Sequence, residues 1–159
     1  MTSLKHVWNL WAHLPQDPNW SEDSYKLIHR FGTLEEVIGV TEMLQPELLC
    51  NCMLFIMKDG IAPMWEDPMN VDGGCFSYRI TNKLVPEVWK ELTYVLVGNT
   101  ISTNDHFAKC VNGITISPKK NFCIIKIWTS TCEHQNPTIV TTDIKNLPPR
   151  GCLFKKHGT

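Results

Sequence analysis

The chain has 159 residues and a formal net charge of -1. This length fits one domain with a single core, and the near-neutral charge excludes a protein that coats nucleic acid through its phosphates, since such proteins are usually basic. No stretch approaches the ~20 apolar residues that span a bilayer, and the start of the chain lacks a secretory pattern. We expect a soluble single domain over residues 1–159, with flexible ends at 1–5 and 155–159.

Seven cysteines are scattered along the chain, an odd number with no Cys-x-x-Cys among them. This pattern favours free thiols in a reducing compartment, the cytoplasm with the nucleus as a second location. A zinc site would have to combine Cys50, Cys52, Cys132 and His134, but neither pair has the spacing of common structural sites. We therefore expect small buried hydrophobic residues and no metal.

The first third of the chain predicts three strands and a helix. Residues 6–12 and 25–31 are apolar and rich in strand-favouring side chains, and the polar loop between them carries Trp20. A capping box and a helical apolar stripe predict a helix over 33–44, which ends before a proline. Residues 53–58 predict the third strand.

The middle of the chain begins with an irregular segment. Two prolines and a glycine prevent regular structure over 59–68, so that Trp65 and Glu66 lie on an ordered loop. Alternating apolar and polar residues predict a strand over 75–81 with one wet face. Residues 86–97 start with proline, show a helical stripe and end at a glycine, which predicts a second helix.

The last third is read as mostly strands and loops. Residues 99–112 are polar and predicted to be loop, whereas 137–147 form a weaker helix candidate because many of its residues are β-branched. Strands are predicted over 113–117, 122–128 and 151–154. The overall pattern indicates an α+β fold in which an antiparallel sheet carries helices on one side.

Six tryptophans in one small domain indicate either a tryptophan-rich core or a surface that stacks on flat ligands. Trp20 and Trp65 stand apart because both lie in polar, proline-containing loops; for either one alone, packing against the core is equally probable. Two indoles beside a carboxylate suit a 7-methylated guanine, whose positive charge adds cation–π attraction to stacking. Glu66 can then accept hydrogen bonds from the guanine N1–H and amino group, although taken alone it is more simply interpreted as a loop carboxylate in water.

Basic residues and enzyme motifs add little by themselves. Lys119 and Lys120 lie in a predicted hairpin turn and can reach a short phosphate chain, although a solvated turn is the more common meaning of such a pair. The sequence contains no nucleophile elbow, phosphate-binding loop or His-Glu-x-x-His motif, and its histidines are scattered. We expect a binding protein that is not an enzyme.

The chain resembles the eukaryotic translation initiation factor 4E family of cap-binding proteins over about residues 6–154. The most specific part is Asp59-Gly60-Ile61-Ala62-Pro63-Met64-Trp65-Glu66-Asp67 followed by Gly73-Gly74. The supporting segments are Val7-Trp8-Asn9-Leu10-Trp11, Asn19-Trp20, Phe31-Gly32-Thr33-Leu34-Glu35-Glu36 and Ile127-Trp128-Thr129 before Cys132-Glu133.

The resemblance implies a curved antiparallel sheet of about eight strands backed by three helices on its convex face, with the cap on the concave face. Trp20 and Trp65 match the stacking tryptophans, Glu66 the guanine-reading carboxylate and Trp128 the residue near the N7-methyl group. Lys119 aligns with a phosphate-contacting residue, and Lys120 is assigned to the same role. The remaining tryptophans, Trp8, Trp11 and Trp89, match structural positions.

Two groups of positions depart from the family pattern. Cys75 and Ile124 stand where relatives have basic phosphate-binding residues, which predicts weaker cap binding unless Lys120, Lys155 or Lys156 compensate. On the convex face, relatives dock an amphipathic helix of a scaffold or repressor on a tryptophan, and that position is Ile38 here. Leu34 and Glu91 are retained, while Lys90 replaces an expected leucine, so a changed partner is expected.

The resemblance therefore implies a monomeric protein that binds capped mRNA and acts in translation initiation through a divergent partner surface. The alternative is a cap-binding repressor or specialised isoform that does not engage the ordinary scaffold. Two further alternatives are an enzyme that cleaves or modifies the cap and an interaction module that has lost cap binding.

Overall fold

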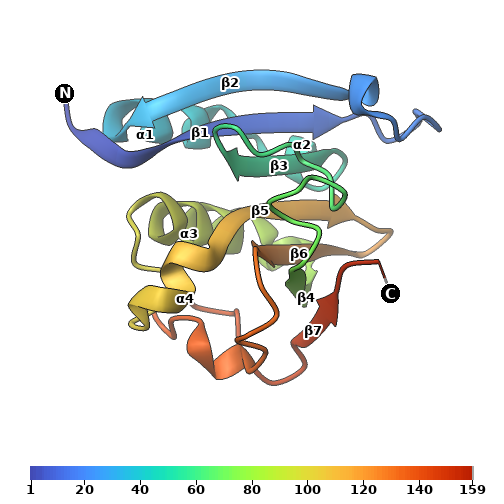
Figure 1. Cartoon of the computed structure of the whole chain (residues 1–159). Helices are drawn as coiled ribbons and strands as arrows, with labels where there is room; N and C mark the ends of the chain where they lie inside the picture. The colour runs from blue at the N-terminus through green and yellow to red at the C-terminus, as the bar shows by residue number, and fades with distance from the viewer. Residues whose placement is uncertain (159) are drawn as a thin grey trace.

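The computed structural model describes residues 1–158, and these form a single curved antiparallel sheet with helices packed on one face (Figure 1). The strand order is β2-β1-β3-β5-β6-β4-β7. The strands are β1 (Ser3–His13), β2 (Tyr25–Thr33), β3 (Met53–Lys58), β4 (Gly74–Thr81), β5 (Val111–Pro118), β6 (Phe122–Thr129) and β7 (Leu153–Lys156). The expected architecture is confirmed, with seven strands in the described residues where about eight were expected.

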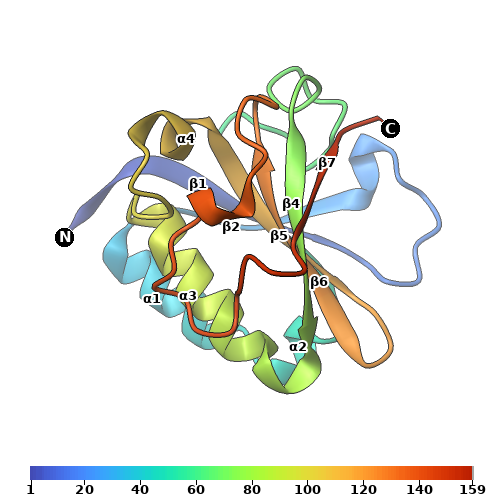
Figure 2. The same ribbon diagram turned by 90° about the horizontal axis from the view of Figure 1, so that it is seen from below.

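Three helices cover the convex face of the sheet, and a fourth lies near one end of it (Figure 2). They are α1 (Leu34–Met43), α2 (Pro46–Leu49), α3 (Val85–Val97) and α4 (Asp105–Cys110), with three short 3-10 turns at Glu22–Ser24, Asn82–Leu84 and Pro137–Ile139. The capping box at the start of α1 is formed as predicted. The Thr33 Oγ1 accepts the Glu36 N–H at 3.2 Å, and the Glu36 carboxylate accepts the Gly32 N–H at 3.1 Å.

The predicted loop over 99–112 is wrong. Its second half contains α4, which the Asn104 side chain caps by accepting the Phe107 N–H at 3.0 Å. Phe107 is fully buried and joins the main core. A helix of six residues is too short to show a periodic stripe, and for this reason the polar composition hid it.

The predicted helix over 137–147 is also wrong, because only its first residues form a 3-10 turn. Val140, Ile144 and Leu147 are nevertheless buried in the main core. Their spacing of four and three residues is the same as that of a helical stripe, but the segment that places these three side chains in the core is irregular. β-branched residues and the two prolines that follow oppose a helix here.

The chain ends are more regular than expected. The flexible end predicted for 1–5 includes the first residues of β1, and Lys155 and Lys156 belong to β7. In the first turn of α1, Leu34 donates its N–H to the Thr2 carbonyl at 2.8 Å, so the N-terminal segment is held against that helix. Thr159 lies outside the described residues.

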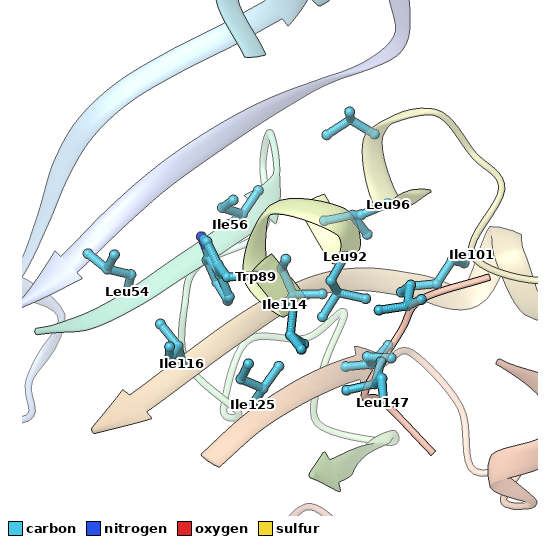
Figure 3. Close-up of a cluster of buried hydrophobic side chains, with 14 of the residues drawn as sticks. Leu54, Ile56, Trp89, Leu92, Leu96, Ile101, Ile114, Ile116, Ile125 and Leu147 are labelled. Atoms are coloured by element: carbon cyan, nitrogen blue, oxygen red, sulfur yellow. The ribbon is translucent and has the colours of Figure 1, made fainter. Parts of the chain in front are cut away.

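The main core lies between the sheet and the helices (Figure 3). Alternate residues of β3, β5 and β6 face α3, and they meet Trp89 and Leu92, which are at most 1% exposed. The labelled members from the strands are Leu54, Ile56, Ile114, Ile116 and Ile125. Because side chains alternate along a strand, the residues in between point to the opposite, concave face. Among residues 1–158 no helix has the length and apolar character that crossing a bilayer requires.

Candidate functional site

A second, smaller apolar cluster forms the floor of the concave face. Phe55, Met57, Cys75 and Trp128 are buried there, with Trp11, Tyr25 and Met53 packed around them. The Trp128 ring is fixed by a hydrogen bond from its Nε1 to the Thr115 Oγ1 at 3.1 Å. The concave face therefore presents a largely aromatic floor built from five strands, β1, β2, β3, β4 and β6.

The loop that carries Trp65 is held by its own side chains. Asp67 accepts hydrogen bonds from the backbone N–H groups of Ala62 and Met69, both at 2.8 Å. Asn70 is fully buried and donates to the Met64 carbonyl at 2.9 Å. These contacts close the loop into a compact turn just before β4.

A pair of asparagines connects this loop to the sheet. The Nδ2 of Asn112, on β5, donates to the Asn70 Oδ1 at 2.9 Å and to the Met69 carbonyl at 2.8 Å. Asn112 is 2% exposed, so the pair is shielded from water. Buried polar groups need such partners, and this pair fixes the position of the loop relative to β5.

Trp65 and Trp128 line one cavity of about 460 Å³. Cationic side chains share it: Lys126 from β6 and Lys155 and Lys156 from β7, together with Cys75, Ser77, His157 and Gly158. Trp65 remains 42% exposed. An aromatic wall beside several ammonium groups suits a flat base that carries a negatively charged chain.

The C-terminal segment, Lys155 to Gly158, forms part of the lining of this cavity. The His157 ring lies 4.8 Å from the Trp128 ring, and the ring Nε2 lies 3.8 Å from the Cys75 Sγ. The backbone N–H of His157 donates to the Gly73 carbonyl at 3.0 Å. Burial, and then the charge of Lys126, lower the pKa of His157. The ring over Trp128 is therefore held in its neutral form more strongly than a free histidine.

Trp20 lines a different cavity, of about 320 Å³, whose lining includes Lys119. Its indole stacks on the His13 ring, with centroids 3.7 Å apart and planes 4° from parallel. His13 is 1% exposed, and its two ring nitrogens lie 3.0 Å from the Leu14 carbonyl and 2.7 Å from the Asn19 carbonyl. The Trp20 loop thus rests on a buried, hydrogen-bonded ring.

Tyr25 connects the two aromatic groups. Its ring contacts His13, Trp20 and Phe55, with centroids 5.2, 6.3 and 5.4 Å away. Burial, and then the charge of Glu66, raise the pKa of Tyr25. The exposed Glu66 is thus close enough to Tyr25 for its charge to influence that ring hydroxyl.

The structure groups the predicted cap residues in two places. Trp20 lies with Lys119, and Trp65 lies with Trp128. Glu66 and Lys120 are exposed, and Lys120 lies in the turn between β5 and β6. The roles assigned to these residues stay predictions.

Sequence reasoning missed several residues that build the site. Asn70 and Asn112 gave no signal, because an asparagine in a loop is usually read as a turn residue. Lys126 was detectable, since it lies two residues before Trp128 in a predicted strand and therefore shares its face. The tail reaches the site as well, because β7 pairs with β4.

Cys75 and Ile124 occupy the positions where a basic residue was expected. Burial raises the pKa of the Cys75 thiol to about 12, so it carries no charge near neutral pH. Ile124 shares a face of β6 with Lys126 and Trp128. The cationic groups near Trp128 therefore come from Lys126 and from β7.

The convex face presents the predicted partner surface. Leu34 and Ile38 on α1 are 38% and 39% exposed. Lys90 is exposed on α3, and Glu91 accepts the Lys145 N–H at 3.1 Å. α1 and α3 lie on the same side of the sheet (Figure 2), opposite to the concave site.

The sequence matches the family described as Eukaryotic initiation factor 4E over residues 3–150. It is 31% identical over 140 residues to eukaryotic translation initiation factor 4E-2 of Schizosaccharomyces pombe, a match that covers 84% of this chain and 56% of that protein. It is 27% identical to eukaryotic translation initiation factor 4E of Candida albicans, covering 91% of this chain and 72% of that protein. The chain thus spans little more than half of one relative.

Solved structures show the same fold. One is a complex of C. elegans eIF4E-3 with the 4E-binding protein Mextli and cap analog, with a TM-score of 0.72 and 28% identity, covering 82% of this chain and 75% of that one. Another is Ascaris suum eIF4E-3 with m7G cap, with a TM-score of 0.73 and 24% identity, covering 83% and 75%.

Proposed function

Because the chain belongs to the eukaryotic initiation factor 4E family, we propose that it binds the 7-methylguanosine cap of mRNA on its concave face. We further propose that it acts in translation initiation by recruiting a protein partner through its convex face. Trp20 and Trp65 stack on the methylated base, Glu66 reads the guanine edge, and Trp128 lies near the N7-methyl group.

The observation that carries this proposal is the cavity that Trp65 and Trp128 share with lysines. Stacking on an indole is worth roughly 1–3 kcal/mol per base, and the positive charge of the methylated base adds cation–π attraction. The lysines face the negative charge of the phosphate chain. A purely apolar ligand would not use the lysines, and an uncharged base without phosphates would use only the stacking on the indoles.

Lys119 and Lys120 are proposed to contact the phosphates from the Trp20 side. Lys126 and Lys155 approach from the Trp65 side and supply the cationic character that Cys75 and Ile124 do not. Ammonium groups on flexible stems act as point charges and do not need the planar geometry of an arginine. Phosphate binding in this chain is therefore shifted toward β6 and β7.

On the convex face, an amphipathic helix of a scaffold or repressor docks its apolar side on Leu34 and Ile38. The C. elegans relative is solved with the 4E-binding protein Mextli, which supports a partner of this kind. An amphipathic helix binds such an apolar surface through side chains that lie one helical turn apart. Ile38 offers a smaller anchor than a tryptophan, and Lys90 adds a positive charge, so the partner is expected to carry an acidic residue there.

The proposed action is equilibrium binding without chemistry. The thiol nearest to the cavity, Cys75, stays protonated because burial raises its pKa to about 12, and a thiol is a poor nucleophile. All seven cysteines are free, in keeping with the cytoplasmic location that we propose for the protein, with the nucleus as a second one.

Intrinsic tryptophan fluorescence during titration with 7-methyl-GTP tests the proposal, with GTP as the control ligand. We expect saturable quenching by the methylated nucleotide alone. Trp65→Ala should weaken binding by about 5- to 150-fold, the equivalent of one lost stack, and Glu66→Ala should remove the preference for guanine. Glu47→Ala, an exposed carboxylate on α2, is the matched control and should bind as the wild type does.

Equal quenching by GTP and 7-methyl-GTP, or unchanged affinity in both site variants, would contradict the proposal. Circular dichroism of each variant shows whether its fold is retained, so that a lost site is distinguished from a lost structure.

A further inference from the structure

Two histidines and a glutamate meet on the surface where α4 approaches the loop after β6. The Nδ1 of His106 lies 2.9 Å from the Nε2 of His134. The Glu133 Oε2 lies 3.3 Å from the first nitrogen and 3.7 Å from the second. These three atoms thus face one another across a single small space.

The surrounding structure holds this cluster in place. His134 packs edge-on against the fully buried Phe107, with ring centroids 5.8 Å apart. Ser130 donates its N–H to the Cys110 carbonyl at 2.8 Å, which fastens the loop to the end of α4. The Gln135 side chain donates to the Cys132 carbonyl at 2.8 Å and closes the turn around Glu133 and His134.

The distances between the three atoms match those of a metal site. Tetrahedral ligands that lie ~2.0–2.2 Å from a zinc ion are separated from one another by about 3.3–3.6 Å. The separations of 2.9, 3.3 and 3.7 Å bracket that range. Two imidazole nitrogens and one carboxylate oxygen are also ligands that Zn²⁺ accepts readily.

We propose that His106, Glu133 and His134 bind a divalent transition metal, Zn²⁺, with the remaining coordination position open to solvent. The ion fastens α4 to the loop that follows β6, the strand that carries Trp128. This site is independent of the cap proposal, because none of its residues lines either of the cavities with Trp20 and Trp65.

The site differs from the zinc combination that the sequence suggested and that we set aside. His134 is the only residue the two sets share. Cys132 directs its Sγ to the Asp72 carbonyl at 3.5 Å and is not among the grouped ligands. Because His106 is far from Glu133 in sequence, these three residues form no local motif from which the site could be predicted.

The competing explanation of the same geometry is a hydrogen bond between the two histidine rings. Such a bond needs one ring N–H and one lone pair, and Glu133 then serves only as a polar or ionic neighbour of the two rings. A metal site instead turns the lone pairs of both rings inward together with a carboxylate oxygen. The two explanations therefore differ in their response to added metal and to Glu133→Gln.

Nuclear magnetic resonance of ¹⁵N-labelled histidine rings during titration with Zn²⁺ tests the proposal. We expect saturation at one equivalent, with the ring nitrogens of His106 and His134 shifting and the other four histidines serving as internal references. With Co²⁺ in place of Zn²⁺, visible ligand-field bands should appear without the near-ultraviolet charge-transfer band of a thiolate ligand. Shifts confined to other histidines, or a thiolate band, would overturn the assignment.

Variants separate the site from adventitious binding by the free cysteines. His106→Ala and Glu133→Gln should each weaken Zn²⁺ binding at least tenfold and abolish the increase in melting temperature that Zn²⁺ causes in the wild type. His29→Ala removes an exposed histidine of β2 and should leave both unchanged. Equal Zn²⁺ affinity in His106→Ala and the wild type would refute the proposal, and because His106 and Glu133 are exposed, both variants are expected to fold.

Discussion

His157 lies over Trp128 in surroundings that disfavour its charged form. Burial is the larger cause of its lowered pKa, and Lys126 adds to it. At pH values between this lowered pKa and the ordinary value of 6.5, His157 binds more protons when the C-terminal segment has left Trp128 than when it is in contact with it. The tail contact is thus fully present above about pH 6.5 and weakens as the pH falls below that value.

Replacing Lys126 tests this explanation of the His157 pKa. In Lys126→Met we expect the pKa to rise but to stay below 6.5, because burial, the larger cause, remains. A ¹H–¹⁵N titration of the ring measures it, and hydrogen exchange at the His157 amide follows the release of the tail. Lys83→Met, on the turn before α3, is the control; a pKa that is unmoved in Lys126→Met contradicts the assigned cause.

At the scale of elements, the position of Trp65 depends on the asparagine pair between its loop and β5. Asn112→Ala leaves the Asn70 Oδ1 without its donor and the Met69 carbonyl without a partner from β5. Each buried polar group left unsatisfied costs about 1–3 kcal/mol. We therefore expect faster hydrogen exchange over residues 59–73 and weaker quenching by 7-methyl-GTP, although no base-contacting residue has changed.

Gln45→Ala is the control for this prediction, because the Gln45 side chain makes no capping hydrogen bond at the start of α2. Denaturant unfolding gives the loss of stability for both variants. Unchanged exchange in the loop of Asn112→Ala would show that the asparagine pair does not hold it.

Elements with strong local signals could be predicted from the sequence, whereas those that depend on distant contacts could not. The capping box of α1 and the proline and glycine that bound α3 act within a few residues, and both helices formed where predicted. In contrast, α4 has a local cap at Asn104 but is too short for a periodic stripe, and the burial of Phe107 in the main core adds a contact that its own sequence does not show. Residues 140–147 show a helical spacing of apolar side chains that tertiary packing uses without a helix.

The candidate site shows the same division. Trp20 and Trp65 can be predicted because tryptophans in polar loops are unusual, and the family resemblance implies roles for them and for Glu66. Lys126, Tyr25 and His157 take part through strand pairing and tail docking, which bring together segments that are far apart in sequence. A sequence pattern does not carry that information.

At the scale of the whole molecule, the proposed cap surface and the proposed partner surface lie on opposite faces of one sheet. Ile38→Asp on α1 places a charge in the proposed helix-binding surface, far from Trp65 and Trp128. Because distant sites act independently unless a two-state element links them, we expect loss of an amphipathic partner helix with unchanged affinity for 7-methyl-GTP. Calorimetry with each ligand measures both.

Glu42→Ala, an exposed change on the same helix, is the comparison for Ile38→Asp. If Ile38→Asp alters cap affinity while its circular dichroism is unchanged, the two faces are coupled through the sheet. In that case the treatment of the molecule as two independent surfaces is wrong.

The stack of Trp20 on His13 bears on the entropy of binding. Because the ring nitrogens of His13 face two carbonyl oxygens, this ring is oriented before any ligand arrives, and the indole lying parallel to it shares that order. Immobilising a side chain at an interface costs about 0.5–1.5 kcal/mol. For Trp20 much of this loss has occurred during folding, and its 53% exposed indole offers an incoming base a surface that is already ordered.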